Sequence, residues 1–201
     1  MKGTYIHPLP VRIWHWINAF IVMVLILTGI QLRAPSVTIL ESYRYVVLIH
    51  KYFGYAMTAS FLFWFFYYLI GRGFKKHYLL TLKDIKAIPD QALYYMYYIF
   101  KGGKNPHTPS MDNRFNPMQK ITYSFIMLIV TPVIAFTGIL FSDILYFFEW
   151  INALGGLRVL DAIHVAAAYV FVFYLIAHLY MSTLGKKFYS HVKSMITGYE
   201  E

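Results

Sequence analysis

The segment AIHVAAAYVFVFYLIAHLYM, residues 162–181, has twenty residues and contains no Asp, Glu, Lys or Arg. A helix of about 20 apolar residues is long enough to cross the hydrocarbon core of a bilayer. The same segment carries two histidines, His164 and His178, and ionisable side chains are rare in membrane helices, where they usually face the bundle interior. The segment therefore predicts a membrane helix with a chemical role.

The rest of the chain is also apolar. Of its 201 residues, 59% are hydrophobic and 13% are charged, whereas soluble domains carry about 25% charged residues. We expect one domain over residues 1–201, an all-α membrane protein built as a bundle of four transmembrane helices. The predicted spans are 13–32, 45–70, 121–141 and 162–184, with a long loop at 71–120.

Basic residues are distributed unevenly between the loops. Fourteen of the 18 Lys and Arg residues lie before the first span, in loop 71–120 or after the fourth span. Because cytoplasmic loops are enriched in Lys and Arg, both termini and this loop are predicted to be cytoplasmic. The net charge of +9 is thereby explained by topology and contact with anionic lipid, and it does not favour a nucleic-acid partner.

The chain has no cysteine, which excludes disulfides, thiolate-bound iron–sulfur clusters and thioether-attached haem within it. An iron–sulfur cluster would have to belong to a partner. Within loop 71–120, the segment ALYYMYYIF (92–100) is too short to span the bilayer, and we expect it to form a surface helix at the lipid headgroups.

The chain contains a faint internal repeat. LTGIQL (27–32) is similar to FTGILF (136–141), and IHKYFGY (49–55) is similar to IHVAAAY (163–169). In this register His50 aligns with His164. Chance similarity between apolar helices explains the pattern equally well.

Four of the eight histidines fall within the predicted helices. Seen against the predicted topology, His15 lies near the inner end of the first span, His50 near the outer start of the second, and His164 near the outer start of the fourth. His178 lies about two turns from the inner end of that fourth helix. The other four histidines are expected to face water or headgroups: His7, His77, His107 and His191.

The spacing of His164 and His178 places them on one face of their helix. Fourteen residues correspond to about 21 Å and nearly four whole turns. One helix therefore offers an imidazole at each of two depths, where His50 is the available mate at the outer depth and His15 at the inner depth.

Paired imidazoles in a helix bundle favour haem over zinc. Zinc takes about four ligands close together, whereas haem iron takes two axial ligands on opposite sides of a flat ring, and imidazole is a usual one. Two pairs thus predict two haems. A structural hydrogen bond is the competing explanation for any single histidine, and a haem-free transporter with a proton or metal relay, or a passive anchor, is the competing function.

Two glycines lie near the predicted haems. Gly29 is fourteen residues from His15, and Gly54 is one turn from His50. A helix surface without a side chain would let a macrocycle approach the backbone. Close helix packing is the alternative role of these residues.

Four stretches resemble the bacterial di-haem cytochrome b subunits that anchor periplasm-facing nickel–iron hydrogenases, formate dehydrogenases and thiosulfate-type reductases. They are HPLPVRIWHW (7–16), LIHKYFG (48–54), NPMQK (116–120) and the His pair at 164 and 178. The resemblance covers essentially the whole chain. It implies two b-type haems, ligated by His15 with His178 on the inner side and by His50 with His164 on the outer side.

The resemblance also implies a quinone site near the inner haem. In the formate dehydrogenase anchors a quinone lies against an Asn-x-Gly-Gln-Lys-like stretch, to which Asn116, Gln119 and Lys120 correspond, with Met118 in place of the glycine. Side-chain amides can donate to a quinone carbonyl. Asn116 followed by Pro117 is also a typical helix start, and both roles are compatible.

The expected function is electron transfer across the bacterial inner membrane. The chain would be the electron-transfer subunit of a quinone-linked oxidoreductase complex, working between menaquinone or ubiquinone and a periplasmic redox subunit, such as an iron–sulfur protein, a hydrogenase or reductase, or a multihaem cytochrome. A stand-alone di-haem quinone reductase that takes electrons from a small diffusible donor is the close alternative.

Overall fold

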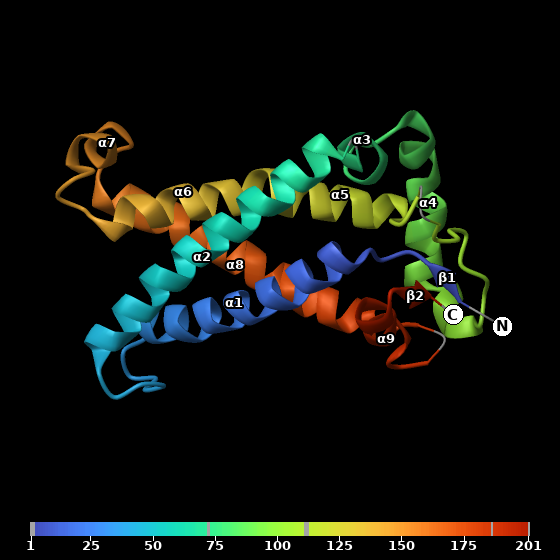
Figure 1. Cartoon of the computed structure of the whole chain (residues 1–201), viewed down its shortest axis with the longest axis horizontal. Helices are drawn as coiled ribbons and strands as arrows, with labels where there is room; N and C mark the ends of the chain where they lie inside the picture. Colours follow the sequence, from blue (N-terminus) through green and yellow to red (C-terminus); the bar gives the residue numbers. More distant parts are fainter. Residues whose placement is uncertain (1–2, 72, 111–112, 186, 201) are drawn as a thin grey trace. The chain divides into compact units, whose positions relative to one another are not determined.

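The computed structural model describes residues 3–71, 73–110, 113–185 and 187–200 and is mostly helical (Figure 1). The chain forms two compact units. Unit 1 contains residues 1–12, 65–128 and 179–201, and unit 2 contains residues 13–64 and 129–178. The four histidines of the predicted haem sites all belong to unit 2.

Each of the four predicted spans forms a long apolar helix. They are α1 (Leu9–Arg33), α2 (Tyr43–Ile70), the composite helix Pro117–Ser142 and α8 (Leu157–Ser182). Each is long and apolar enough to cross a membrane, which confirms the predicted fold class. α1, α8 and the composite helix begin four or five residues before the predicted spans, because polar residues at the membrane boundary continue the helix.

The third span is assembled from three segments. α5 (Pro117–Phe125) continues through a π-helical turn, η2 (Ile126–Val130), into α6 (Thr131–Ser142). Pro132 occupies the first turn of α6. A proline removes one backbone donor, and a π-helical turn is a usual adjustment to the broken hydrogen-bond ladder.

In unit 2, side-chain contacts join α1, α2, α6 and α8 in a ring, with at least one contact in each step: α1 to α2, α2 to α6, α6 to α8, and α8 to α1. In that order the contacts are Thr28–His50, Lys51–Ser142, Thr137–His164 and His178–His15. Three of the four contacts involve a histidine of the predicted sites, so the same residues close the bundle and line its interior.

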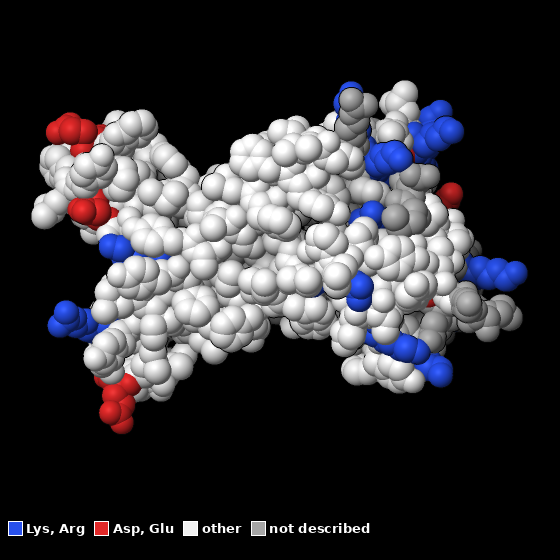
Figure 2. All heavy atoms as spheres, viewed as in Figure 1, with Lys and Arg blue, Asp and Glu red and all other residues white. Residues whose placement is uncertain are grey.

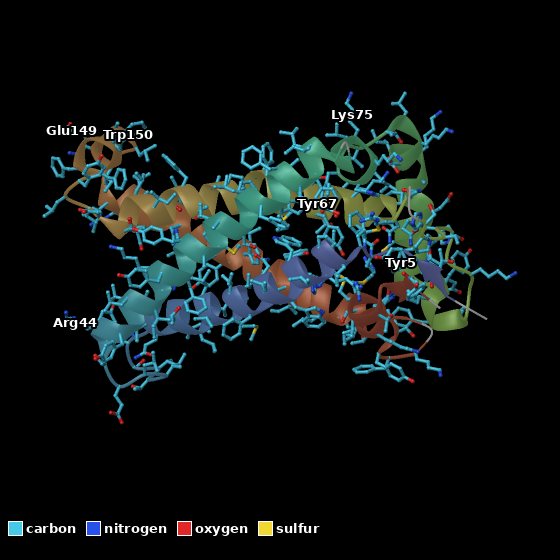
Figure 3. All side chains as sticks on the ribbon, viewed as in Figure 1. Tyr5, Arg44, Tyr67, Lys75, Glu149 and Trp150 are labelled. Carbon is cyan, nitrogen blue, oxygen red and sulfur yellow. The ribbon has the colours of Figure 1, made fainter. Side chains whose placement is uncertain are left out.

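A short helix, α7 (Phe148–Ala153), lies between α6 and α8 in the chain and packs against both. Ile151 packs with Leu140 of α6 and Leu160 of α8 in a buried cluster. Gly155 and Gly156, with φ of 98° and 88°, turn the chain from α7 into α8, a conformation that side-chain-bearing residues rarely adopt. Figure 3 shows Glu149 and Trp150 projecting from α7.

Unit 1 is built from shorter elements around the beginning of α5. They are α3 (Gly73–His77), α4 (Leu82–Met96), the 3₁₀ helix η1 (Tyr98–Lys101), α9 (Ser190–Thr197), and the paired strands β1 (Thr4–Tyr5) and β2 (Tyr199–Glu200). The surface helix expected at 92–100 was placed too late. The chain is already helical from Leu82, because Thr81 and Asp84 form a capping box.

Helix α4 buries polar residues and exposes apolar ones. Asp84 and Gln91 are 8% and 1% exposed, whereas Leu82 and Met96 are 78% and 72% exposed. The buried polar groups have partners, because Gln91 donates to Asn105 and Asp84 pairs with a lysine of α5. Lys and Arg side chains are visible over α3 and α4 (Figure 2). Exposed apolar side chains together with nearby Lys and Arg suit a helix at the boundary between lipid and water.

The lysine that pairs with Asp84 is Lys120. Its ammonium group lies 3.0 Å from both carboxylate oxygens, and both side chains are almost fully buried. Burial raises the pKa of Asp84, but hydrogen bonds from Thr81 and the pairing with Lys120 outweigh burial and hold that pKa below its ordinary value. The pair therefore fastens the first turn of α4 to the first turn of α5.

We predict that breaking this pair destabilises unit 1 more than removing it entirely. Asp84→Asn or Lys120→Met leaves one buried charge without its partner, which costs about 3–5 kcal/mol. The double variant removes both charges and recovers most of that loss. Thermal unfolding of the purified protein in detergent measures the three variants, and an additive double variant would contradict the coupling.

The same pair predicts a pH dependence. Because the pKa of Asp84 is depressed in the folded state, its contribution to stability is complete above the pKa of an unfolded aspartate and is lost as the pH falls through the folded value. The melting temperature of the wild type should therefore fall more steeply on acidification than that of Asp84→Asn. Parallel pH profiles would contradict this assignment.

Candidate functional site

His50 and His164 face each other inside unit 2. His50 comes from α2 and His164 from α8, and their ring centroids are 6.4 Å apart with an angle of 70° between the planes. Both residues are partly buried. The ring of Phe141 lies edge-on to His164 at 5.6 Å, so an apolar wall borders this pair.

His15 and His178 form a second pair of the same kind. His15 comes from α1 and His178 from α8, and their ring centroids are 6.2 Å apart with an angle of 49° between the planes. The ring centroids of Trp16 and His15 are 5.2 Å apart, edge to face, and those of Tyr174 and His178 are 5.6 Å apart. The two histidines of α8 are fourteen residues apart on one continuous helix, which corresponds to about 21 Å.

The spacing within each pair fits two ligands on one metal. A metal-bound imidazole nitrogen lies about 2 Å from the ion and about 1 Å from its own ring centroid, so two rings on opposite sides of one ion have centroids roughly 6 Å apart. The two observed separations, 6.4 Å and 6.2 Å, match this geometry.

In the rings of His50 and His164, one nitrogen is hydrogen-bonded and the other is available to a metal. Nδ1 of His50 lies 2.8 Å from the hydroxyl of Thr28, and Nδ1 of His164 lies 2.8 Å from the hydroxyl of Thr137. In each ring Nε2 is then the nitrogen left for a metal. In the other pair, Nδ1 of His15 is buried and has no hydrogen-bond partner among the described residues.

The ligand set favours haem over a structural or catalytic metal ion. Within the described residues, no three His, Cys, Asp or Glu side chains converge at one point. Each imidazole pair supplies two ligands only. A flat macrocycle that already contributes its own equatorial nitrogens needs two axial ligands, and an apolar bundle interior suits its porphyrin faces.

The glycines near the pairs have different surroundings. A Cβ on Gly29 would lie 3.4 Å from Cε1 of His50, so this glycine contacts the imidazole ring itself. A Cβ on Gly54 would have no described atom within 4 Å, which leaves open space beside α2 one turn from His50. Of the two, Gly54 has the surroundings that a macrocycle edge requires.

Asn116, Gln119 and Lys120 lie in unit 1, where their polar groups serve the start of α5. The Asn116 side chain accepts from the Gln119 backbone, and the Gln119 side chain accepts from the Asn116 backbone, which completes a capping box. Asn116 also donates to the hydroxyl of Tyr95 at 2.8 Å. Lys120 is committed to Asp84. The helix-start interpretation of this stretch is confirmed.

The sequence analysis missed three residues that contact His50 or His164. Thr28, Thr137 and Gly138 contact the imidazoles, and a Cβ on Gly138 would lie 3.4 Å from Cε1 of His164. All three lie in the repeated Thr-Gly stretches, so the repeat contained the signal. The expectation for His77 was wrong: it is 4% exposed and packs against Tyr68 and Phe115.

Residues 6–198 match the family described as prokaryotic cytochrome b561. The chain belongs to this family. It is 27% identical to the putative cytochrome YdhU of Escherichia coli strain K12 over 202 residues, which cover 98% of this chain and 75% of that protein. It is also similar, over shorter stretches, to two probable Ni/Fe-hydrogenase B-type cytochrome subunits.

These shorter matches cover one part of each chain. The protein of Cupriavidus necator is 45% identical over 38 residues, which are 19% of this chain and 16% of that one. The protein of Rhizobium leguminosarum bv. viciae is 50% identical over 34 residues, which are 17% of this chain and 14% of that one. They show common ancestry of a segment.

Membership of the cytochrome b561 family, together with four apolar helices, makes the protein an integral membrane protein that binds b-type haem and transfers electrons. The haem-free transporter and the passive anchor considered from the sequence therefore do not apply. The residues around the two imidazole pairs fit such a group, as the centroid distances and the open space beside Gly54 indicate.

We predict that Gly54→Leu lowers haem content without destabilising the helix. Leucine has a higher helix propensity than glycine, and its side chain would fill the open space next to His50. The absorbance of the Soret band per mole of protein measures the loss. Ala166→Leu, an exposed position on α8, is the matched control and should keep full haem content. Full haem in Gly54→Leu would contradict a macrocycle at this position.

Proposed function

We propose that the protein carries electrons through two b-type haems across the bacterial inner membrane, between a redox enzyme on the periplasmic side and the quinone pool. The observation that carries the proposal is the presence of two imidazole pairs with metal-ligand spacing, separated by fourteen residues along α8. One such pair would bind a single haem, and two pairs at different depths provide a route along the membrane normal.

Each haem, when bound, supplies a centre that accepts and releases one electron. In the proposed sites His50 and His164 would hold the outer haem, and His15 and His178 would hold the inner haem. Because two imidazoles leave no open coordination position, these sites are suited to electron transfer and not to oxygen activation.

Quinone is the proposed substrate at the cytoplasmic side. Its conversion to quinol takes two electrons and two protons, so the site needs an electron route and contact with water. Gln119 uses Oε1 to cap α5, and its Nε2 amide group is the donor that it can offer to a quinone carbonyl. In this arrangement Asn116 and Lys120 hold the helix start, while Gln119 contacts the substrate.

The topology is proposed from the charge distribution. The basic loop 71–120 and both termini lie on the cytoplasmic side, and the loops 33–44 and 142–161 lie on the periplasmic side. Both outer loops connect helices of unit 2, which contains the four histidines. The outer pair, His50 and His164, is close to these loops along α2 and α8.

A protein partner is proposed to dock on the outer loops. Leu145, Tyr146 and Trp150 are 88%, 78% and 62% exposed around α7. Aromatic and aliphatic side chains exposed together are typical of interaction surfaces. The short matches to hydrogenase B-type cytochrome subunits also favour a redox-enzyme partner over a small diffusible donor. Co-purification of a redox subunit that is lost in Trp150→Ala would support the larger complex.

We predict two b-type haems per chain. A pyridine haemochrome assay with protein quantitation measures the ratio. His164→Ala and His178→Ala should each lose one haem, and the two losses should affect spectroscopically distinct centres. His191→Ala, whose side chain is 43% exposed, is the control and should keep both. One haem in the wild type, or a single variant that loses both haems while remaining folded, would contradict the proposal.

A further inference from the structure

The two outer-pair histidines are held in the same way by different helices. On α1, the Thr28 hydroxyl lies 2.8 Å from Nδ1 of His50 and 2.7 Å and 3.2 Å from the carbonyl oxygens of Val24 and Leu25. On α6, the Thr137 hydroxyl lies 2.8 Å from Nδ1 of His164 and 2.8 Å and 3.2 Å from the carbonyl oxygens of Val133 and Ile134.

The hydrogen-bond direction follows from the single proton of a hydroxyl group. In each threonine that proton is directed to the backbone carbonyls of the preceding turn, which cannot donate. The hydroxyl oxygen must then accept from the imidazole, so Nδ1 carries the hydrogen in both rings. This arrangement fixes one tautomer and leaves Nε2 with its lone pair for the metal.

The residue after each threonine completes the contact. A Cβ on Gly29 would lie 3.4 Å from Cε1 of His50, and a Cβ on Gly138 would lie 3.4 Å from Cε1 of His164. Each Thr-Gly dipeptide therefore holds one imidazole by a hydrogen bond at Nδ1 and by close backbone approach at Cε1. We call Thr28–Gly29 and Thr137–Gly138 the two Thr-Gly clasps.

Packing alone does not require a hydroxyl at these positions. Thr28 and Thr137 are 4% and 3% exposed and lie in otherwise apolar helices. A threonine that bonds back to its own helix is slightly unfavourable there, and valine has nearly the same shape. The feature that valine lacks is the acceptor for Nδ1–H.

We propose that Thr28 and Thr137 are positioning residues that lower the reduction potential of the outer haem. An imidazole that donates its second N–H to an oxygen becomes a more basic ligand. A more basic axial ligand stabilises the oxidised, more positively charged iron. Because both ligands of the outer pair have such an acceptor, the two effects act on one centre. This inference rests on the proposed ligation by His50 and His164.

The two threonine hydroxyls bond the imidazoles of the outer pair. Nδ1 of His15, in the inner pair, has no hydrogen-bond partner within the part of the chain that the structure describes. Thr28 is bonded to His50 and Thr137 to His164, both of the outer pair. Removing either hydroxyl should therefore change one haem and leave the other as an internal reference.

The test is a potentiometric titration of the purified haem protein, comparing the wild type with Thr28→Val, Thr137→Val and the matched Thr28→Ser and Thr137→Ser variants. The outer haem is identified as the centre lost in His164→Ala. In each valine variant the reduction potential of the outer haem should rise. The oxidation equilibrium should change by up to about tenfold, which is about 59 mV for one electron. The serine variants should retain the wild-type value, and the inner haem should not shift.

Three results would overturn the inference: unchanged outer potentials in both valine variants, equal shifts of both haems, or a loss of outer haem in the serine variants as well as the valine variants. Loss of the outer haem in the valine variants alone would support positioning by the hydroxyl. Failure of the proposed function is a separate outcome, because a wild type without two haems would show it before any threonine is changed.

Discussion

The structure depends on two pairs of imidazoles held with their ring centroids about 6 Å apart inside an apolar helix bundle. A polar ring in such an interior is costly unless its nitrogens are bonded. The bundle meets this constraint with threonine hydroxyls on the rings of His50 and His164, and the proposed haem ligation would satisfy the remaining nitrogen of each ring. The ring of contacts that joins α1, α2, α6 and α8 passes through these same histidines.

The internal repeat of the sequence corresponds to two equivalent threonine–histidine contacts in the structure. Each half contributes a helix with a Thr-Gly clasp near its C-terminal end and a following helix whose eighth residue is a histidine. The first half presents Thr28 to His50, and the second presents Thr137 to His164. The two halves then meet through the two histidines, so the proposed outer haem would lie between equivalent elements. The inner pair does not follow the repeat, because His15 aligns with Ser124 of the third span.

Much of this arrangement could be predicted from the sequence. Apolar runs of the required length identify the four spans, and the fourteen-residue spacing of His164 and His178 identifies one face of α8 and two depths. Side-chain partners could not be predicted in the same way. The repeat marks Thr28 and Thr137 as equivalent positions, but only the interhelical distance shows that their hydroxyls reach an imidazole. Likewise, His77 is buried by tertiary packing that no local pattern of loop 71–120 encodes.

The central claim is that each imidazole pair ligates one haem iron. Electron paramagnetic resonance combined with near-infrared magnetic circular dichroism of the oxidised, purified protein tests this most directly, because the two spectra report spin state and axial ligands. We expect two low-spin ferric centres, each with two imidazole ligands. A high-spin centre, or a charge-transfer band that indicates methionine or another non-imidazole ligand, would contradict the account.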